Sequence, residues 1–229
     1  MFLHSNDYDD LFNDLNRTNI DGSRYYEVSK GTVYPSVTSV ISFISREKFA
    51  NWRAKVGEEA ANRKTKRATT RGTNLHTLTE VYLQNGPYKE TKEWKVPLIN
   101  LMFNSAKGTF DERIGTIYQQ ETTMSSDRLC LAGTVDLICE FDGELSVVDF
   151  KTSEKAKPEE WLEDYFVQLS AYWAMFSERT GVIPKKLVVF LVAENGELQI
   201  VERRNIMHYL KTLRNYVAQF IEYRDGRSH

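Results

Sequence analysis

The hydrophobic pattern of this 229-residue chain changes its period near residue 110. Before that point, the pattern predicts helices at about 39–49, 49–68, 73–83 and 97–108. After it, strand-like runs are expected at 115–124, 129–141 and 144–152, then a helix at 158–180. Strands at 187–193 and 197–203 and a helix at 206–223 follow. This order predicts an α/β fold with a central mixed β-sheet flanked by helices and an N-terminal helical elaboration.

Local signals fix two of the connections. Asp142-Gly143 lies between the second and third predicted strands and is a strong hairpin turn. Residues 31–38 are expected to be extended, because Pro35 disfavours a helical conformation at Tyr34. Ser36 or Thr38 is then the expected cap of the first helix.

Composition excludes several classes of protein. No run approaches the roughly 20 apolar residues of a membrane-spanning helix, so we expect no membrane partner. The first residues are acidic and lack an apolar signal segment, so a cytoplasmic protein is expected rather than a secreted one. Cys130 and Cys139 are the two cysteines, too few for a disulfide scaffold or a cysteine-ligated iron–sulfur cluster.

The formal net charge of -2 conceals an uneven distribution along the chain. Residues 1–30 are acidic, whereas residues 46–71 contain nine basic residues against three acidic ones. This basic run is either a solvated helix face or a surface that contacts phosphates. Trp52 within it is either a core residue or a platform for a base. The candidate DNA-binding residues of the run are Trp52, Arg53, Arg63, Lys64, Lys66, Arg67 and Arg71.

Three charged residues lie on two neighbouring predicted strands. Asp149 and Lys151 are two positions apart, so they project from the same face of the third strand. Asp136 lies on the preceding strand, which the hairpin turn brings alongside. Burying charge is costly unless the charge is paired or binds a metal. The sequence therefore predicts that the three groups converge, with a surface Asp149–Lys151 ion pair as the alternative.

Two carboxylates and a lysine at one point support a specific chemistry. Carboxylates bind hard divalent cations such as Mg²⁺, which in turn bind phosphate oxygens. A metal of this kind activates water and stabilises charge on a scissile phosphate. The lysine can position or deprotonate the attacking water, or neutralise the developing negative charge.

Four elements of the sequence follow one another in order: His76 in a predicted helix, Asp136, Asp149-Phe150-Lys151, and Gln168-Leu-Ser-Ala-Tyr172. Together they resemble the PD-(D/E)xK nuclease superfamily and, within it, the RecB-like exonuclease branch. The resemblance implies a restriction-endonuclease-like core.

Further motifs narrow the resemblance over residues 31 to 203. Tyr34-Pro-Ser-Val-Thr-Ser-Val, Trp52-Arg, Gly72-x-x-x-His76-x-x-x-Glu80 and Asp149-Phe-Lys-Thr-Ser are similar to the mitochondrial genome maintenance exonuclease family. That family has phage and bacterial members, and the absence of a transit peptide favours one of these. A phage-encoded member would act in the bacterial host cytoplasm.

The resemblance implies a role for each matched residue. The expected metal ligands are His76, Glu121, Asp136, Asp149 and the carbonyl of Phe150, and the expected catalytic residues are Asp136, Asp149, Lys151, Gln168 and Tyr172. Glu80 lies one turn after His76 and is expected to orient its ring. Ser36 and Thr38 are expected to contact a phosphate.

Structural alternatives stay open for several of these residues. His76 and Tyr172 fit a packing role, and Glu80 and Glu121 fit solvated positions. Ser36 and Thr38 are equally explained by helix capping.

The expected function is a Mg²⁺- or Mn²⁺-dependent exonuclease that cleaves single-stranded DNA from free ends in replication, repair or recombination. The alternatives are a structure-specific endonuclease of the same superfamily and a non-catalytic DNA-binding accessory protein. We expect an acidic segment at 1–30, a helical DNA-binding part at 31–110 and a nuclease core at 111–229, integrated as one domain. The expected partners are single-stranded DNA and replication or recombination proteins, with the chain itself a monomer.

Overall fold

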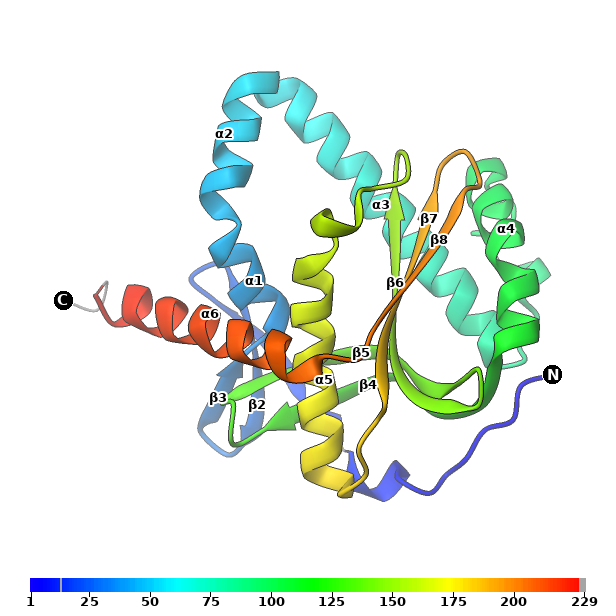
Figure 1. The fold of residues 1–229 in the computed structure, drawn as a ribbon. Coiled ribbons are helices and arrows are strands. Elements are labelled where there is room, and N and C mark those ends of the chain that lie inside the picture. The colour runs from blue at the N-terminus through cyan, green and yellow to red at the C-terminus, as the bar shows by residue number, and fades with distance from the viewer. Residues whose placement is uncertain (13, 227–229) are drawn as a thin grey trace.

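A five-stranded sheet with the order β4-β5-β6-β7-β8 lies at the centre of the computed structural model, which describes residues 1–12 and 14–226 (Figure 1). Position 13 of the expected acidic segment and positions 227–229 of the expected core lie outside the described residues. The strands are β4 (Ile114–Ser126), β5 (Leu131–Phe141), β6 (Glu144–Ser153), β7 (Lys186–Ala193) and β8 (Leu198–Arg203). β6 and β7 are parallel and the other neighbours are antiparallel. The predicted mixed sheet flanked by helices is confirmed.

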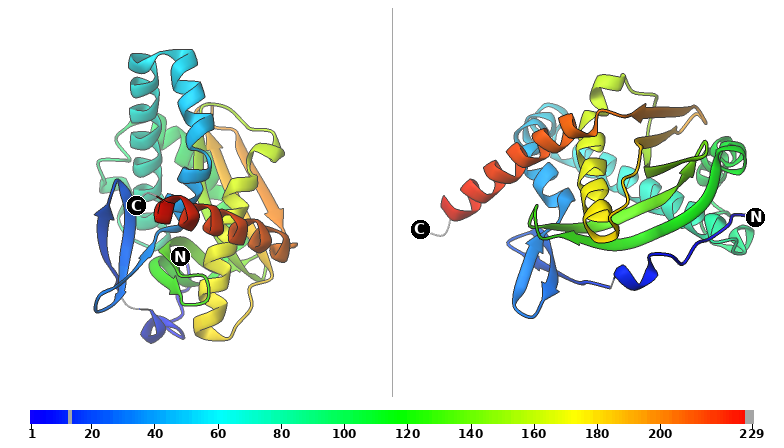
Figure 2. Two further views of the ribbon diagram at one scale, coloured as in Figure 1. Left: turned by 90° about the vertical axis from the view of Figure 1, so that its left-hand side faces the viewer. Right: turned by 60° about the horizontal axis from the view of Figure 1, so that its bottom comes forward.

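Helices cover both faces of this sheet (Figures 1 and 2). Residues of α1 (Val37–Ile44), α5 (Glu163–Thr180) and α6 (Ile206–Gly226) pack in one apolar core. Residues of α3 (Glu58–Leu83) and α4 (Pro97–Arg113) pack in a second core. Val147 belongs to the first core and its neighbour Val148 to the second, because successive strand side chains point to opposite faces. A buried central strand with continuous apolar residues follows from this arrangement.

The turn at Asp142-Gly143 joins β5 to β6 as predicted. Phe141 pairs with Glu144 across it, and both turn residues have positive φ angles of 53° and 74°. This geometry is the one that Asp-Gly favours in a two-residue hairpin loop.

The basic run forms a helical hairpin, which we call the helical arm (residues 46–68). α2 (Arg46–Val56) ends at Gly57, which has a φ of 85°, and α3 begins at Glu58. Figure 1 shows α2 and the start of α3 rising beyond the sheet. The predicted helix boundary at residue 49 and the predicted break between residues 68 and 73 were wrong. A positive φ at Gly57 ends α2 instead, and α3 continues without a break through Gly72.

A second, three-stranded antiparallel sheet was not predicted. It consists of β1 (Asn16–Ile20), β2 (Ser23–Ser29) and β3 (Thr32–Pro35). Bridge pairing of Ser36 with Ala132 joins its end to β5. Short 3₁₀ helices occur at η1 (Asp9–Leu11), η2 (Tyr88–Glu90) and η3 (Glu159–Trp161).

None of the helices in the described ranges combines the length and apolarity that crossing a membrane requires.

Candidate active site

β5 and β6 separate from each other at the two predicted aspartates. Their pairing runs from Phe141 and Glu144 to Leu137 and Val148, whereas β6 stays paired to β7 as far as Ser153. Asp136 and Asp149 are the next residues on the two strands. We call this place the β5–β6 fork, with Asp136, Asp149 and Lys151 as its charged residues. At the separation, the amide of Phe150 on β6 donates a hydrogen bond to Oδ2 of Asp136 at 2.8 Å, which fixes this carboxylate between the two strands.

Three residues from three elements meet beside the fork. His76 of α3, Glu121 of β4 and Asp136 of β5 each offer one ligand atom, and these atoms all lie within 4.8 Å of one another. One imidazole and two carboxylates form a donor set that suits a hard or borderline divalent cation. The structure thus brings together three of the expected ligands.

The ring of His76 has an oxygen near each nitrogen. Nε2 lies 2.5 Å from the carbonyl oxygen of Phe150, and Nδ1 lies 3.6 Å from Oδ2 of Asp136. An imidazole nitrogen grouped with carboxylate and carbonyl oxygens is a donor set that a shared cation can bind.

Glu121 has an unusual backbone conformation opposite Asp136. Its φ is 49°, and the ladder between β4 and β5 pairs Gln120 with Leu137 and Thr122 with Val135 but skips Glu121. A non-glycine residue in this region is strained, and such strain often marks functional sites. Desolvation, followed by the charges of Asp136, Glu80 and Asp149, raises the pKa of Glu121 to about 8. A bound cation would relieve the repulsion between these crowded carboxylates.

Asp149 and Lys151 form a buried ion pair on β6. Nζ of Lys151 lies 2.7 Å from both carboxylate oxygens of Asp149, which is 1% exposed. Oδ2 of Asp149 nevertheless accepts no well-directed hydrogen bond within the described part of the chain. Burial raises the pKa of Asp149 to about 6, although the Lys151 charge opposes this effect. Burial also lowers the pKa of Lys151, but the charges of Asp149 and Asp136 outweigh it and hold that pKa above its usual value.

Gln168 and Tyr172 of α5 complete this network. Nε2 of Gln168 lies 3.4 Å from Oδ1 of Asp149 and 3.4 Å from the Tyr172 hydroxyl, and its Oε1 lies 3.5 Å from Nζ of Lys151. Burial raises the pKa of the Tyr172 phenol, which therefore stays neutral. The predicted one-turn spacing does place both side chains on the fork.

Gly133 makes room for Tyr172. A Cβ at Gly133 would lie 2.9 Å from Cε1 and 3.1 Å from the hydroxyl oxygen of Tyr172. The glycine three residues before Asp136 therefore allows α5 to approach β5 closely.

A hollow of about 370 Å³ opens beside His76. It is lined by Gly72, Thr73, His76, Thr77, Glu80 and Glu121. Among the described residues, no hydrogen bond joins Glu80 to His76. Glu80 instead accepts a hydrogen bond from Gln84 and adds negative charge near Glu121, while Asp136 faces Nδ1 of His76.

The residues at the fork fit a divalent cation on structural grounds. The crowded carboxylates of Glu121 and Asp136, and the imidazole of His76 beside them, favour a divalent cation there. Asp149 is held by Lys151 rather than grouped with His76, Glu121 and Asp136. The carbonyl of Phe150 lies beside His76, as expected of a further ligand.

Several arginines of the predicted DNA-binding set are paired with carboxylates. Arg53 binds Glu58, and Arg63 binds Glu59. Arg67 and Arg71 both bind Glu194 in the turn between β7 and β8.

Arg71 is only 6% exposed, and its Nε donates to Thr152 of β6 at 3.0 Å. The Arg71 guanidinium thus ties α3 to the strand that carries Lys151.

The other residues of that set lie as follows. Trp52 stacks on Phe49, with ring centroids 5.3 Å apart, and both line a hollow together with Lys64. Lys66 is exposed on α3. Ser36 is buried and caps α1 by accepting from the Ser39 amide at 3.0 Å, and it is hydrogen-bonded to Thr38.

Three residues of the site region were not singled out from the sequence: Glu194, Thr152 and Tyr165. The ring of Tyr165 lies 5.1 Å from Nζ of Lys151. Tyr165 and Thr152 flank the predicted Asp-x-Lys and Gln-x-x-x-Tyr motifs, so proximity in sequence was an available signal. Glu194 is 123 residues from its partner Arg71, and no local pattern predicts such a pair.

Comparison with known proteins identifies the family of the chain. The family model of the PD-(D/E)XK nuclease superfamily matches residues 46–225. The chain belongs to this superfamily, and the membership supports a nuclease function. The narrower assignment to the mitochondrial genome maintenance exonuclease family stays a prediction.

A solved structure from Eubacterium rectale, of a protein provisionally designated an exonuclease, is similar with a TM-score of 0.43 and 13% sequence identity. The match covers 67% of this chain and 65% of that one, so the chain spans less than two thirds of that protein. No curated protein matches the sequence.

Proposed function

We propose that the protein is a metal-dependent exonuclease that hydrolyses single-stranded DNA from free ends. The observation that carries this proposal is a hollow of about 880 Å³ between the helical arm and the segment that joins β6 to α5. We call it the arm hollow. Tyr165 belongs to its lining, and the Tyr165 ring lies 5.1 Å from Nζ of Lys151, so the hollow is next to the fork.

The lining of the arm hollow suits an unpaired strand. Its aromatic residues are Phe49, Trp52, Trp161 and Tyr165, and its basic residues include Lys64, Lys155 and Lys157. Trp161 is 67% exposed, an unusual state for so large an apolar side chain. Stacking requires bases that are free of a complementary strand, and lysines track the phosphates. This combination favours single-stranded over duplex DNA.

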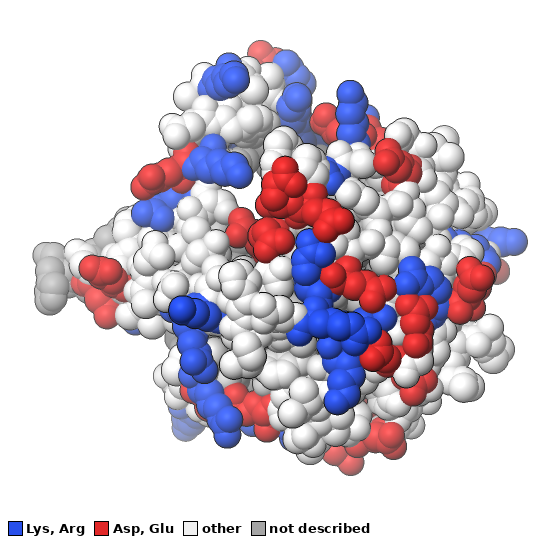
Figure 3. All heavy atoms as spheres, in the orientation of Figure 1, with Lys and Arg blue, Asp and Glu red and all other residues white. Residues whose placement is uncertain are grey.

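Figure 3 shows where charge gathers on one face. Lys and Arg lie over the helical arm, and a group of acidic residues lies below it at the segment before α5. The small net charge of -2 is compatible with such a local basic surface.

The fork supplies the groups for hydrolysis. His76, Glu121, Asp136, Asp149 and the Phe150 carbonyl would hold Mg²⁺ or Mn²⁺, which when bound activates water and neutralises phosphate charge. The Lys151 ammonium, fixed by Asp149, stabilises negative charge that develops on the scissile phosphate. Gln168 and Tyr172 keep that lysine and Asp149 in position.

Digestion of linear and circular single strands of the same sequence tests the proposal. We expect linear single strands to be degraded, circular strands of the same sequence to stay intact, and EDTA to stop the reaction. Blocking the 5′ or the 3′ end then reports the polarity. Cleavage of circles would identify an endonuclease instead. Strand binding without metal-dependent nucleotide release would identify an accessory protein.

We further propose that the chain is a phage or bacterial member of the mitochondrial genome maintenance exonuclease family and acts as a monomer in replication, repair or recombination. The motifs quoted above support this assignment. Sedimentation is expected to give the mass of one 26.6 kDa chain. A dimer mass would contradict the monomer.

A further inference from the structure

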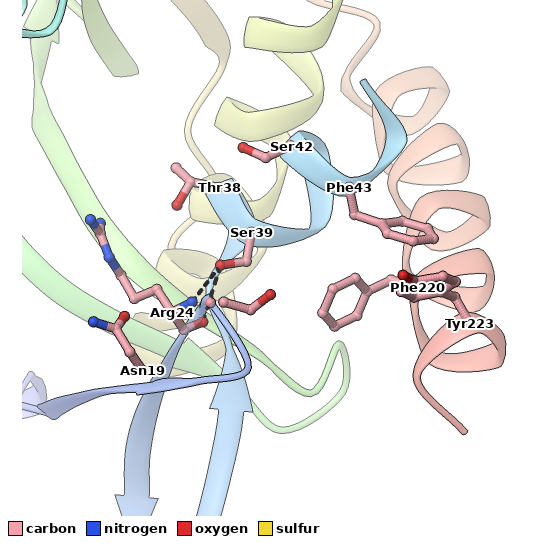
Figure 4. Close-up of a pocket in the computed structure, with 10 residues that line it drawn as sticks. Asn19, Arg24, Thr38, Ser39, Ser42, Phe43, Phe220 and Tyr223 are labelled. Atoms are coloured by element: carbon pink, nitrogen blue, oxygen red, sulfur yellow. Dashed lines mark hydrogen bonds between the residues drawn. The ribbon is translucent and has the colours of Figure 1, made fainter. Parts of the chain in front are cut away.

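A second hollow lies between the small sheet, α1 and α6, on a different set of elements from the fork. It has a volume of about 470 Å³, which is in the range of small-molecule sites. We call it the hairpin hollow. Figure 4 shows its two walls: Asn19, Arg24 and Thr38 lie on one side, and Phe43, Phe220 and Tyr223 on the other. A polar wall facing an aromatic wall is the arrangement that a nucleotide needs for its phosphate and its base.

The polar wall holds a cation on a rigid backbone. The amide of Arg24 donates to Oγ of Ser39 at 2.8 Å, and the carbonyl of Arg24 accepts from the Ser36 amide at 2.8 Å and from Oγ of Ser39 at 3.2 Å (Figure 4). Asn19 is the cross-strand partner of Arg24. Among the described residues, the Arg24 guanidinium makes no hydrogen bond or ion pair, in contrast to Arg53, Arg63, Arg67 and Arg71. Its donors are therefore available to a phosphate.

The aromatic wall offers a stacking surface. Phe43 lies 4.7 Å from Tyr223 and 5.5 Å from Phe220, measured between ring centroids. The guanidinium carbon of Arg46 lies 3.7 Å from the centroid of the Phe43 ring and 5.2 Å from that of the Tyr223 ring, so this cation holds the two rings together. Tyr223 is 42% exposed at the rim. An exposed tyrosine supported by other rings is suited to stack on a base of any identity.

The hairpin hollow is connected to the fork through β5. Ser36, at the start of α1, pairs with Ala132, which lies four residues before Asp136 on the same strand. Four strand residues span roughly 13 Å. One nucleic-acid strand could therefore reach both places.

We propose that the hairpin hollow is a subsite for one nucleotide of the substrate strand, in which Arg24 binds the phosphate and Tyr223 stacks on the base. This inference rests on the proposed function, because it assigns a remote contact to the same substrate. It would let the enzyme grip the strand away from the scissile bond and favour substrates long enough to span both places.

Binding of fluorescent single strands in EDTA tests the subsite without catalysis. The variants are Arg24→Ala and Tyr223→Ala, and Arg17→Ala is the matched control because it removes the same charge from the same hairpin outside the hollow. For a long strand that spans the fork and the hairpin hollow, we expect each test variant to bind roughly tenfold more weakly. The control should bind like wild type. For a short strand that fills the fork alone, all proteins should bind equally.

The outcomes separate the two proposals. If wild type cleaves and binds DNA but Arg24→Ala and Tyr223→Ala bind the long strand normally, the subsite is refuted and the proposed function stands. If wild type neither binds nor cleaves, the proposed function fails. The mononucleotide dAMP serves as a competitor. If dAMP displaces the long strand with an affinity equal to that of the strand itself, the hairpin hollow is a site for free nucleotides. That result would overturn the strand subsite.

Discussion

The β5–β6 fork and the helical arm both carry charge, but they hold it in opposite ways. At the fork, Asp149 is 1% exposed and its partner Lys151 is fixed by Gln168 and the Tyr165 ring. On the arm, Lys64 and Lys66 are exposed, and Arg63 pairs with a neighbouring glutamate that is itself 89% exposed.

Buried charges interact strongly because little water screens them, whereas exposed charges interact weakly and respond to salt. The fork should therefore respond to single changes with large losses, and the arm with small ones.

The largest effect is expected from Lys151→Ala. Removing this cation takes away charge stabilisation at the scissile phosphate, so the cleavage rate should fall by roughly 10³-fold. Binding of single strands should stay largely intact. Lys211→Ala is the control, because it removes the same charge from an exposed position of α6. Full activity of Lys151→Ala on labelled oligonucleotides would refute the assigned fork.

Gly133→Ala should destabilise the fork through packing alone. The added methyl would overlap Tyr172, and overpacking of this kind costs about 1–3 kcal/mol. Thermal unfolding should show a lower Tm, and cleavage should fall with it because Tyr172 is displaced. Gly108→Ala is the control, since a Cβ there meets nothing within 4 Å. An unchanged Tm for Gly133→Ala would show that β5 and α5 are packed loosely enough to accept the methyl group.

On the arm, Trp52→Ala should weaken binding of single strands by roughly tenfold, since one stacked base contributes about 1–3 kcal/mol. The cleavage rate at saturating substrate should change little. Titration of labelled strands at two salt concentrations measures both the loss and its salt dependence. Because stacking involves no charge, the salt dependence should match that of wild type. A loss of cleavage at saturation would place Trp52 among the catalytic groups.

The pH dependence of metal-free stability reports the crowded carboxylates. The pKa of Glu121 is raised from 4.5 to about 8 in the folded state. The folded state therefore binds more protons than the unfolded state in this window, so stability falls as the pH rises from about 4.5 to about 8. Asp149, raised from 3.8 to about 6, acts in the same direction at lower pH.

Glu121→Gln should flatten the decline of Tm between about pH 6 and pH 8, measured in EDTA. Parallel curves for the variant and wild type would contradict the raised pKa. Adding Mg²⁺ or Mn²⁺ should stabilise wild type more than the variant.

The smallest effect is expected from Lys64→Ala. An exposed lysine that contacts one phosphate contributes about 0.7 to the slope of log affinity against log salt for a single strand. The variant should lose that increment and bind only a few-fold more weakly at low salt. An unchanged slope would show that Lys64 is a solvated charge and that the strand follows another path.

The sequence was informative wherever local chemistry decided the structure. Asp142-Gly143 predicted its hairpin, and the one-turn spacing of Gln168 and Tyr172 placed both on one helix face. Asp21-Gly22 also has positive φ angles, of 49° and 77°, and joins β1 to β2, so a hairpin signal was present there too. It was missed because β1 is exposed along its whole length, is polar except for Ile20, and shows no apolar alternation.

The sequence by itself determined the α/β order of the central sheet and its helices, and it predicted which residues would hold a metal and act on a phosphodiester. Periodicity, turn chemistry and motif spacing are local properties, and they suffice for those conclusions.

Only the tertiary structure decided where the strands separate, that Glu121 meets His76, and that Glu194 neutralises two arginines of the basic run. Likewise, only the fold joined Arg24 of the hairpin to Tyr223 of α6 in one hollow. These contacts link residues far apart in the chain, and their energies depend on burial that no local pattern encodes.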